Sequence, residues 1–349
     1  MSNTEECEAV DLRSSTGFAI AGKSCDRTSR PASNEFSHRW LTRREVLKQG
    51  GYGIGVLTCA ASACMGDAGI SQTSPSALRD GIGLPKGWRS MRKIDVHNHV
   101  FDAVDQPGAN WARVESMIEA AEWLGIETLC CSRPITGGAM AEIAEVRRAN
   151  DAVLATMQRY PDRVRGFCFI QPGNGRLAID EMQRCFDQGM IGVKLYNQFK
   201  YADPMVYPIA EKCIELRIPL LGHSAHLTDA RSIAAQPMTS DSLEFCKLAT
   251  RFPELILILG HINGGGDWEW AIKGLRECEN VYLDTSGSVL ENDTIEMCVR
   301  ELGVKRILFA TDQTMEGCVG KILSAQLSSE QREDIFWKNA HAIFARRTS

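Results

Sequence analysis

The sequence predicts an α/β protein: a (β/α)8 TIM barrel over residues 91–349, preceded by a leader that does not belong to the fold. Two observations predict this class. Eight short apolar runs alternate with amphipathic segments over about 260 residues, as in a closed eight-stranded barrel. No glycine-rich loop follows the first apolar run, whereas a doubly wound open sheet would normally carry one there. We therefore favour the barrel.

The apolar runs are interpreted as strands from their length and their polar boundaries. The strands are expected at 93–97, 127–131, 165–170, 191–195, 218–222, 255–260, 280–284 and 306–311. Amphipathic helices are expected between several of them, at 111–125, 139–160, 176–188, 204–217 and 241–251.

The leader divides into three parts. Residues 1–40 are polar and cannot build a core, so a disordered extension is expected. Residues 41–65 place Arg43 and Arg44 ahead of a Gly- and Ala-rich apolar run, and this segment resembles a twin-arginine export signal. A membrane anchor is the alternative, but the run of about 16 residues is shorter than the roughly 20 that a transmembrane helix needs. Residues 66–90 are expected to form a linker.

The resemblance to an export signal implies a partner and a location. The twin-arginine export machinery would carry the folded chain to the bacterial periplasm or cell envelope. Small residues at 61–63 offer a cleavage site, and acylation of Cys64 would leave the chain lipid-anchored.

Composition excludes some function classes. A net charge of −5 and a pI near 5.9 argue against binding nucleic acid, which requires a basic face. The 13 cysteines lie mostly in apolar segments without paired spacing, so free thiols packed as small hydrophobes are expected. The composition permits a homo-oligomer without requiring one.

Polar residues stand where the predicted strands end. His97 and His99 close the first strand, and their spacing of two places both imidazoles on one face. Lys194 closes the fourth strand, His223 the fifth and His261 the sixth, and Asp312 closes the eighth. In a barrel these ends open onto one face, where active sites are built. Asp95, two residues before His97, is expected to support the site from the barrel floor.

This ordered set resembles the amidohydrolase superfamily of TIM-barrel, metal-dependent hydrolases, and in particular its amidohydrolase-related branch. The resemblance covers 92 to 345, including the closing segment 336–344. It implies that His97, His99, His223 and Asp312 bind a divalent metal, most simply zinc, with manganese or iron as alternatives.

The same resemblance implies the catalytic roles. Asp312 would also take a proton from metal-bound water, and His261 would bind a second ion or act in proton transfer. Lys194 would either bridge two ions as a carbamylated lysine or contact a substrate carboxylate, so one or two ions remain open. His226, just beyond the fifth strand, is a further candidate for contacting a small-molecule substrate.

Two reaction classes follow from these ligands. The first expectation is a hydrolase, in which a metal-bound hydroxide attacks a small amide, lactone or ester. The alternative is a lyase, a decarboxylase or hydratase of an aromatic or unsaturated carboxylic acid, with Lys194 or an arginine near Arg133 holding the carboxylate. A barrel without activity is disfavoured, because every strand-end ligand is present.

Overall fold

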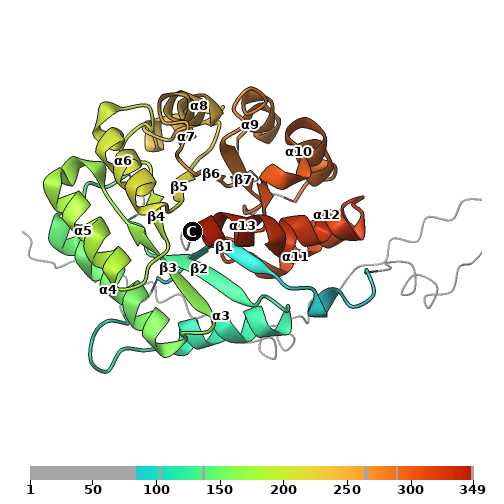
Figure 1. Ribbon diagram of the computed structural model, residues 1–349, viewed down its shortest axis with the longest axis horizontal. Helices are drawn as coiled ribbons and strands as arrows, with labels where there is room; N and C mark the ends of the chain where they lie inside the picture. The colour runs from blue at the N-terminus through green and yellow to red at the C-terminus, as the bar shows by residue number, and fades with distance from the viewer. Residues whose placement is uncertain (1–83, 102–103, 136–137, 263–265, 288–289, 347–349) are drawn as a thin grey trace, which may run out of the picture. The chain divides into compact units, whose positions relative to one another are not determined.

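The computed structural model describes residues 84–101, 104–135, 138–262, 266–287 and 290–346. Eight parallel strands follow one another around a barrel in chain order, and helices surround them (Figure 1). The strands are β1 (Ile94–His99), β2 (Thr128–Ser132), β3 (Val164–Phe169), β4 (Gly192–Leu195), β5 (Leu220–His223), β6 (Leu257–Gly260), β7 (Val281–Asp284) and β8 (Ile307–Leu308). The predicted fold class is confirmed.

The helices connect the strands around the outside of the ring (Figure 1). They are α3 (Ala112–Trp123), α4 (Ile143–Arg159), α5 (Arg176–Asp187), α6 (Tyr207–Leu216), α7 (Ala230–Ala235), α8 (Ser242–Arg251), α9 (Trp268–Gly274), α10 (Thr294–Leu302), α11 (Met315–Ser324), α12 (Ser329–Glu333) and α13 (Asn339–Ala345). Short 3-10 turns and one π-helical turn complete the elements: η1 (Trp88–Ser90), η2 (Pro172–Asn174), η3 (Pro204–Val206), η4 (Val304–Arg306) and η5 (Asp334–Lys338).

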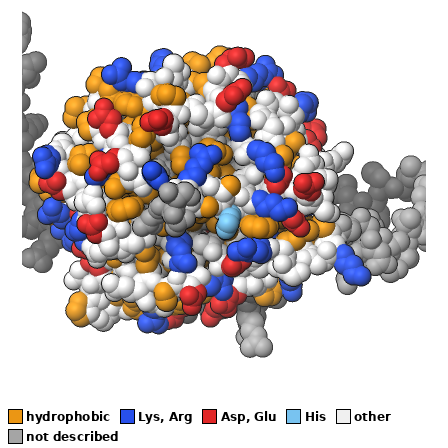
Figure 2. All heavy atoms as spheres, in the orientation of Figure 1, with side chains coloured by type: hydrophobic (Ala, Val, Ile, Leu, Met, Phe, Trp, Pro, Cys, Tyr) orange, Lys and Arg blue, Asp and Glu red, His pale blue; other side chains and the backbone are white. Residues whose placement is uncertain are grey.

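Backbone hydrogen bonds close the barrel between β1 and the segment that follows β8. The Val96 N–H donates to the Phe309 carbonyl at 3.0 Å, and the Asp312 N–H donates to the His97 carbonyl at 2.8 Å. The amino-terminal end of the barrel is covered by α13, where Ala340 and Ile343 pack with Ile94 and other strand residues. Figure 2 shows this side of the molecule, with basic and acidic side chains interspersed over its surface.

One buried polar residue joins three elements behind β3. Asn150, on α4, accepts from the Phe169 N–H at 2.8 Å and donates to the Phe169 carbonyl at 3.1 Å. It also donates to the buried carboxylate of Glu181 on α5 at 2.8 Å. The amide thus fixes both helices against the sheet.

The strand boundaries differ from prediction at the two strands that carry the site. β1 continues to His99, so both predicted imidazoles belong to the strand. β8 ends at Leu308 rather than 311, because the next backbone groups bond to side chains instead of a ladder. The Ala310 N–H donates to Thr285 Oγ1 at 3.1 Å and the Thr311 N–H donates to Asp95 Oδ1 at 3.0 Å.

The prediction that all cysteines are free thiols is wrong for two of them. Cys246 on α8 and Cys278 before β7 form a disulfide with a Cα–Cα distance of 5.7 Å. Their separation of 32 residues hides the pair, because only the packing of α8 against the β6–β7 connection brings them together. Seven other described cysteines are free and buried, as expected.

The predicted extension, the signal segment with Arg43, Arg44 and Cys64, and most of the 66–90 linker lie outside the described residues. Among the helices that the structure describes, none has the length and apolar character needed to cross a bilayer.

Candidate metal centre

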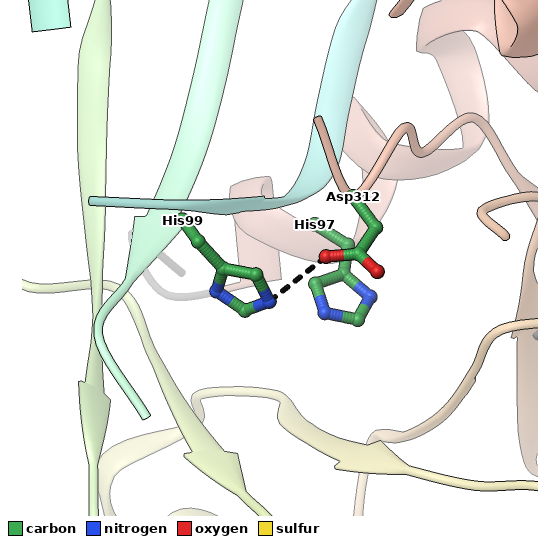
Figure 3. Close-up of side chains that lie close together, drawn as sticks. All are labelled: His97, His99 and Asp312. Atoms are coloured by element: carbon green, nitrogen blue, oxygen red, sulfur yellow. Dashed lines mark ion pairs between the residues drawn. The ribbon is translucent and has the colours of Figure 1, made fainter. Parts of the chain in front are cut away.

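Two histidines and an aspartate come together at the carboxyl ends of β1 and β8. One potential ligand atom from each of His97, His99 and Asp312 lies within 4.8 Å of the others. Figure 3 shows the three side chains facing a common space, with His99 Nε2 3.0 Å from Asp312 Oδ1. Two imidazoles and one carboxylate are a ligand set for a divalent transition metal.

The contacts behind His99 favour a cation at this point. His99 Nδ1 lies 3.1 Å from the Ser132 hydroxyl and 3.3 Å from the Ser132 carbonyl, and because the carbonyl can only accept, a hydrogen bond to it puts a proton on Nδ1. Nε2 can then bond to the Asp312 carboxylate only if the ring is doubly protonated. A metal ion would take the place of that second proton and satisfy both atoms, so the residues fit a bound ion.

Asp312 is held by its backbone as well as by its charge. It has a positive φ of 44°, and its N–H donates to the His97 carbonyl at 2.8 Å. Gln313, also at positive φ, donates from Nε2 to the His99 carbonyl at 2.9 Å. Burial acts to raise the pKa of Asp312, but the hydrogen bond from His99 and nearby positive charge outweigh it and hold the pKa at about 2. The side chain is therefore a carboxylate.

Lys194 lies directly against the centre. Its side chain is fully buried, and its Nζ is 2.7 Å from His97 Nε2. Burial lowers the pKa of Lys194 to about 8. The structure therefore places the predicted lysine beside a predicted ligand, and whether it bridges ions or holds substrate stays a prediction.

His223 and His261 complete a row of imidazoles. The His261 ring centroid lies 4.5 Å from that of His97 and 4.7 Å from that of His223. Burial lowers the pKa of all three rings well below the ordinary value, which keeps them neutral and able to bind a metal. His223 Nδ1 is buried without a hydrogen-bond partner in the described part of the chain, which fits a ligand role, although His223 lies outside the tight cluster of three.

Close packing requires a glycine beneath these rings. A Cβ on Gly260 would lie 2.7 Å from the Gly222 carbonyl oxygen, 3.2 Å from His97 Cε1 and 3.3 Å from Asp284 Oδ2. Backbone atoms of β5 cannot move aside, so β6 passes the centre only with glycine at this position.

Asp95 supports the centre from within the barrel, as predicted. It is fully buried and accepts from the Thr311 N–H and hydroxyl, the Asn98 amide and the His97 N–H. These bonds tie β1 to the chain that leads into Asp312. Burial raises the pKa of Asp95 to about 7, against the opposing effect of its hydrogen bonds.

His226 lies in a different environment from the row of imidazoles. Its Nδ1 is 2.8 Å from Asp241 Oδ2, at the start of α8, and its ring centroid is 5.0 Å from that of Trp270. These contacts anchor the loop after β5. Its predicted contact with substrate stays a prediction.

The sequence did not single out three polar side chains that surround the centre. Ser132, at the end of β2, contacts His99, and Ser286, after β7, contacts His261 Nδ1 at 3.0 Å. Gln313 directly follows Asp312, a predicted ligand, so its position in the sequence could have indicated that it lies at the site. Serines carry no comparable signal. Asp284, the last residue of β7, is fully buried behind His97.

A cavity that contains two arginines shares one wall residue, Phe101, with the surroundings of His99. It has a volume of about 370 Å³ and is lined by residues that include Phe101, Arg133, Glu145 and Arg148. The Phe101 ring centroid lies 5.5 Å from that of His99. Among the described residues, no carboxylate pairs with Arg133 or Arg148. Two guanidinium groups beside an aromatic wall suit an aromatic anion.

Comparisons with known proteins agree with this fold. Residues 94–346 match the amidohydrolase family. A gamma-resorcylate decarboxylase from Polaromonas sp. strain JS666 is 27% identical over 320 residues, covering 76% of this chain and 94% of the relative.

Solved structures show the same fold. The structure of a 2,6-dihydroxybenzoate decarboxylase complexed with 2,6-dihydroxybenzoate has a TM-score of 0.59 at 20% identity, covering 73% of this chain and 99% of the other. The structure of a dihydroxybenzoic acid decarboxylase from Polaromonas sp. JS666, with bound manganese and the inhibitor 2-nitroresorcinol, has a TM-score of 0.56 at 22% identity and covers 72% and 96% of the two chains.

The expectation of a hydrolase is wrong. The curated relatives that match this chain include gamma-resorcylate decarboxylases, and a decarboxylase breaks a carbon–carbon bond and does not add water. The same ligand types serve both reactions, so the strand-end residues alone could not separate them. Zinc, the metal expected first, also lacks support, whereas a related structure holds manganese.

Proposed function

Since the chain belongs to the amidohydrolase family, we propose that it is a metal-dependent decarboxylase of a small aromatic carboxylic acid. The observation that carries the proposal is the match to a gamma-resorcylate decarboxylase, which extends over 94% of that protein. The site supports it, because Phe101, whose ring centroid lies 5.5 Å from that of His99, also lines a cavity with two guanidinium groups, and no carboxylate among the described residues pairs with either group.

The reaction replaces a carboxylate on a ring carbon by a proton. The proton adds to the ring carbon, the bond to the carboxylate breaks, carbon dioxide leaves and the electron pair returns to the ring. A divalent ion held by His97, His99 and Asp312, with His223 as a further ligand, would supply positive charge to the oxygens of the substrate. Manganese is our proposal for this ion, because a related structure contains it.

The chain's own residues would orient the acid and move the proton. Arg133 or Arg148 at the rim, and Lys194 inside, offer cations to a carboxylate. Asp312 Oδ2 lies 3.5 Å from His261 Nδ1, so the two can pass a proton between them at the metal centre. The imidazole rings of His97, His99 and His261 are buried, which would keep bulk water away from the substrate carbon that accepts the proton.

The test uses the purified full chain with Mn²⁺ and a panel of hydroxybenzoates that includes 2,6-dihydroxybenzoate. Release of carbon dioxide, with solvent deuterium at the vacated ring carbon, is the expected result. His97→Ala and the chelator-treated chain should release none. A folded, manganese-containing chain that releases no carbon dioxide from any member of the panel would refute the proposal.

We also propose export by the twin-arginine machinery. The paired arginines in 41–65 support it, and a disulfide is the kind of bond that persists in oxidising compartments. Fractionation of cells that express the native chain and an Arg43→Lys/Arg44→Lys variant tests it. The variant should stay in the cytoplasm, and equal periplasmic amounts would count against export.

A further inference from the structure

Asp284, the last residue of β7, contacts the ring of His97 and the backbone of His261. Its Oδ2 lies 2.7 Å from His97 Nδ1, and its Oδ1 accepts from the His261 backbone N–H at 2.9 Å. Oδ1 also accepts from the Ser286 N–H at 2.9 Å and from the Ser286 hydroxyl at 2.6 Å. All of these groups are buried, so water does not compete for these hydrogen bonds.

These contacts determine the protonated nitrogen of His97. A carboxylate has no proton to donate, so His97 Nδ1 must donate to Asp284 Oδ2. The second nitrogen, Nε2, is then a lone-pair acceptor. It faces Lys194 Nζ at 2.7 Å, and an ammonium group has only protons to offer, which agrees with this assignment.

The same reasoning applies to His261 through the serine. The Ser286 hydroxyl has one proton, and its short bond to Asp284 Oδ1 uses that proton. Ser286 Oγ can therefore only accept from His261 Nδ1 at 3.0 Å. Asp312 Oδ2, 3.5 Å from the same nitrogen, is also an acceptor. Both neighbours require a proton on Nδ1 and leave Nε2 without one.

We propose that Asp284 and Ser286 are positioning residues that fix His97 and His261 as Nδ1–H tautomers, so that each ring presents an unprotonated Nε2. Asp284 acts on His97 directly and on His261 through Ser286. His97 then offers its lone pair to the metal, and His261 offers a base to the reacting groups. The inference rests on the metal centre of the proposed function, but the tautomers it assigns can be measured in the metal-free chain.

Nitrogen NMR tests the inference without metal or substrate. The full chain, labelled with ¹⁵N-histidine and freed of metal, is examined by long-range proton–nitrogen correlation, which separates protonated from unprotonated ring nitrogens. His97→Gln and His261→Gln assign the signals. We expect a proton on Nδ1 of both rings in the wild type, and a proton on Nε2 of either neutral ring would overturn the inference.

Variants then separate the two residues. Ser286→Ala should leave the Nδ1 proton of His97 in place, because Asp284 Oδ2 at 2.7 Å holds it more closely than Ser286 Oγ at 3.5 Å. The same variant should allow His261 to populate both tautomers, whereas Asp284→Asn should alter both rings. Thr285→Val is the matched control, because Thr285 lies between the two residues in sequence and, among the described residues, its hydroxyl bonds only to the backbone of Ala310. Ser286→Ala spectra identical to wild type at His261 would refute the role of the serine, even if Asp284→Asn does not fold.

Binding and kinetics provide a second readout. Asp284→Asn should weaken Mn²⁺ binding, measured by calorimetry, by about 10–100-fold, the usual loss when the partner of a ligating histidine is removed. Ser286→Ala should keep its Mn²⁺ affinity and lower kcat at unchanged KM, and Ser286→Thr, which retains the hydroxyl, should restore kcat. Wild-type Mn²⁺ affinity in Asp284→Asn would overturn the role of the aspartate. If the chain decarboxylates no hydroxybenzoate, the spectra and the Mn²⁺ affinities still decide the inference.

Discussion

Lys93, immediately before β1, gives a quantitative test of the packing beneath the site. Its Nζ donates to the Trp88 carbonyl at 2.7 Å and to the Met91 carbonyl at 2.9 Å, and the side chain has no exposed surface. Burial lowers the pKa of Lys93 from 10.5 to about 8. Between these two values the unfolded chain binds more protons than the folded chain, so the free energy of unfolding rises with pH.

The size of that rise follows from the shift. A difference of about 2.5 pKa units corresponds to about 3 kcal/mol at 1.36 kcal/mol per unit. The destabilisation caused by burying the charged lysine is fully present below pH 8 and is removed as the pH approaches 10.5. For a chain of this size, about 3 kcal/mol corresponds to about 6–12 °C in Tm.

The measurement compares wild type, Lys93→Met and the exposed-lysine control Lys86→Met by thermal unfolding from pH 7.5 to 10.5. Alkaline effects common to all three chains cancel in the differences. The Tm of wild type should rise relative to that of Lys93→Met by about 6–12 °C over this range, and Lys86→Met should follow wild type. Parallel curves for wild type and Lys93→Met would show that Lys93 is charged in the folded chain at high pH and would refute the argument.

Three further predictions concern the metal, a buried amide and the disulfide. Free Mn²⁺ at 100 times its dissociation constant should stabilise the chain by about 2.7 kcal/mol in calorimetry, and His99→Ala should lose this gain; equal stabilisation of the variant would place the ion elsewhere. Asn150→Leu leaves the Phe169 N–H and carbonyl unpaired, so urea unfolding should show a loss of at least about 2 kcal/mol, and a loss below 1 kcal/mol would contradict the bonds assigned to the amide. Cys246→Ser/Cys278→Ser opens a loop of 32 residues and should lower stability by about 3–4 kcal/mol, with reductant lowering wild type to the same level; insensitivity to reductant would mean that the disulfide does not form.

The fold could be predicted because its signals are local. Each strand is a short apolar run, and each helix shows an apolar face, so their alternation, together with the absence of a glycine-rich loop after the first strand, predicts a barrel. The end of β8 could not be predicted in this way. Ala310 and Thr311 are apolar or β-branched and read as strand, but their N–H groups bond to Thr285 and Asp95 side chains that arrive from other strands.

The residues of the site follow the same rule: those with a local signal could be predicted, and those without one could not. The histidines and Asp312 could be predicted because ligand types recur at strand ends, and the barrel brings those ends together. Ser132 and Ser286 could not, since a serine at a strand end is common and gains meaning only from a neighbour 33 or 25 residues away. The disulfide could not be predicted either, because its cysteines are brought together only by helix packing.

The distinction between hydrolysis and decarboxylation lies outside the ligand set. Both reactions use a metal ion held by a carboxylate and neutral imidazoles. His97, His99 and Asp312 could hold that ion for either reaction. The two reactions differ in the substrate that the site must hold. A carboxylic acid is bound well by a second cation besides the metal. A neutral amide or ester would leave that second cation desolvated without a partner, which costs binding free energy. Arg133 and Arg148 line a cavity one aromatic ring away from His99, with no carboxylate paired to either among the described residues. Replacing both by glutamine should therefore raise KM for a hydroxybenzoate much more than it lowers kcat, whereas a fall in kcat at constant KM would place the carboxylate elsewhere, most simply at Lys194.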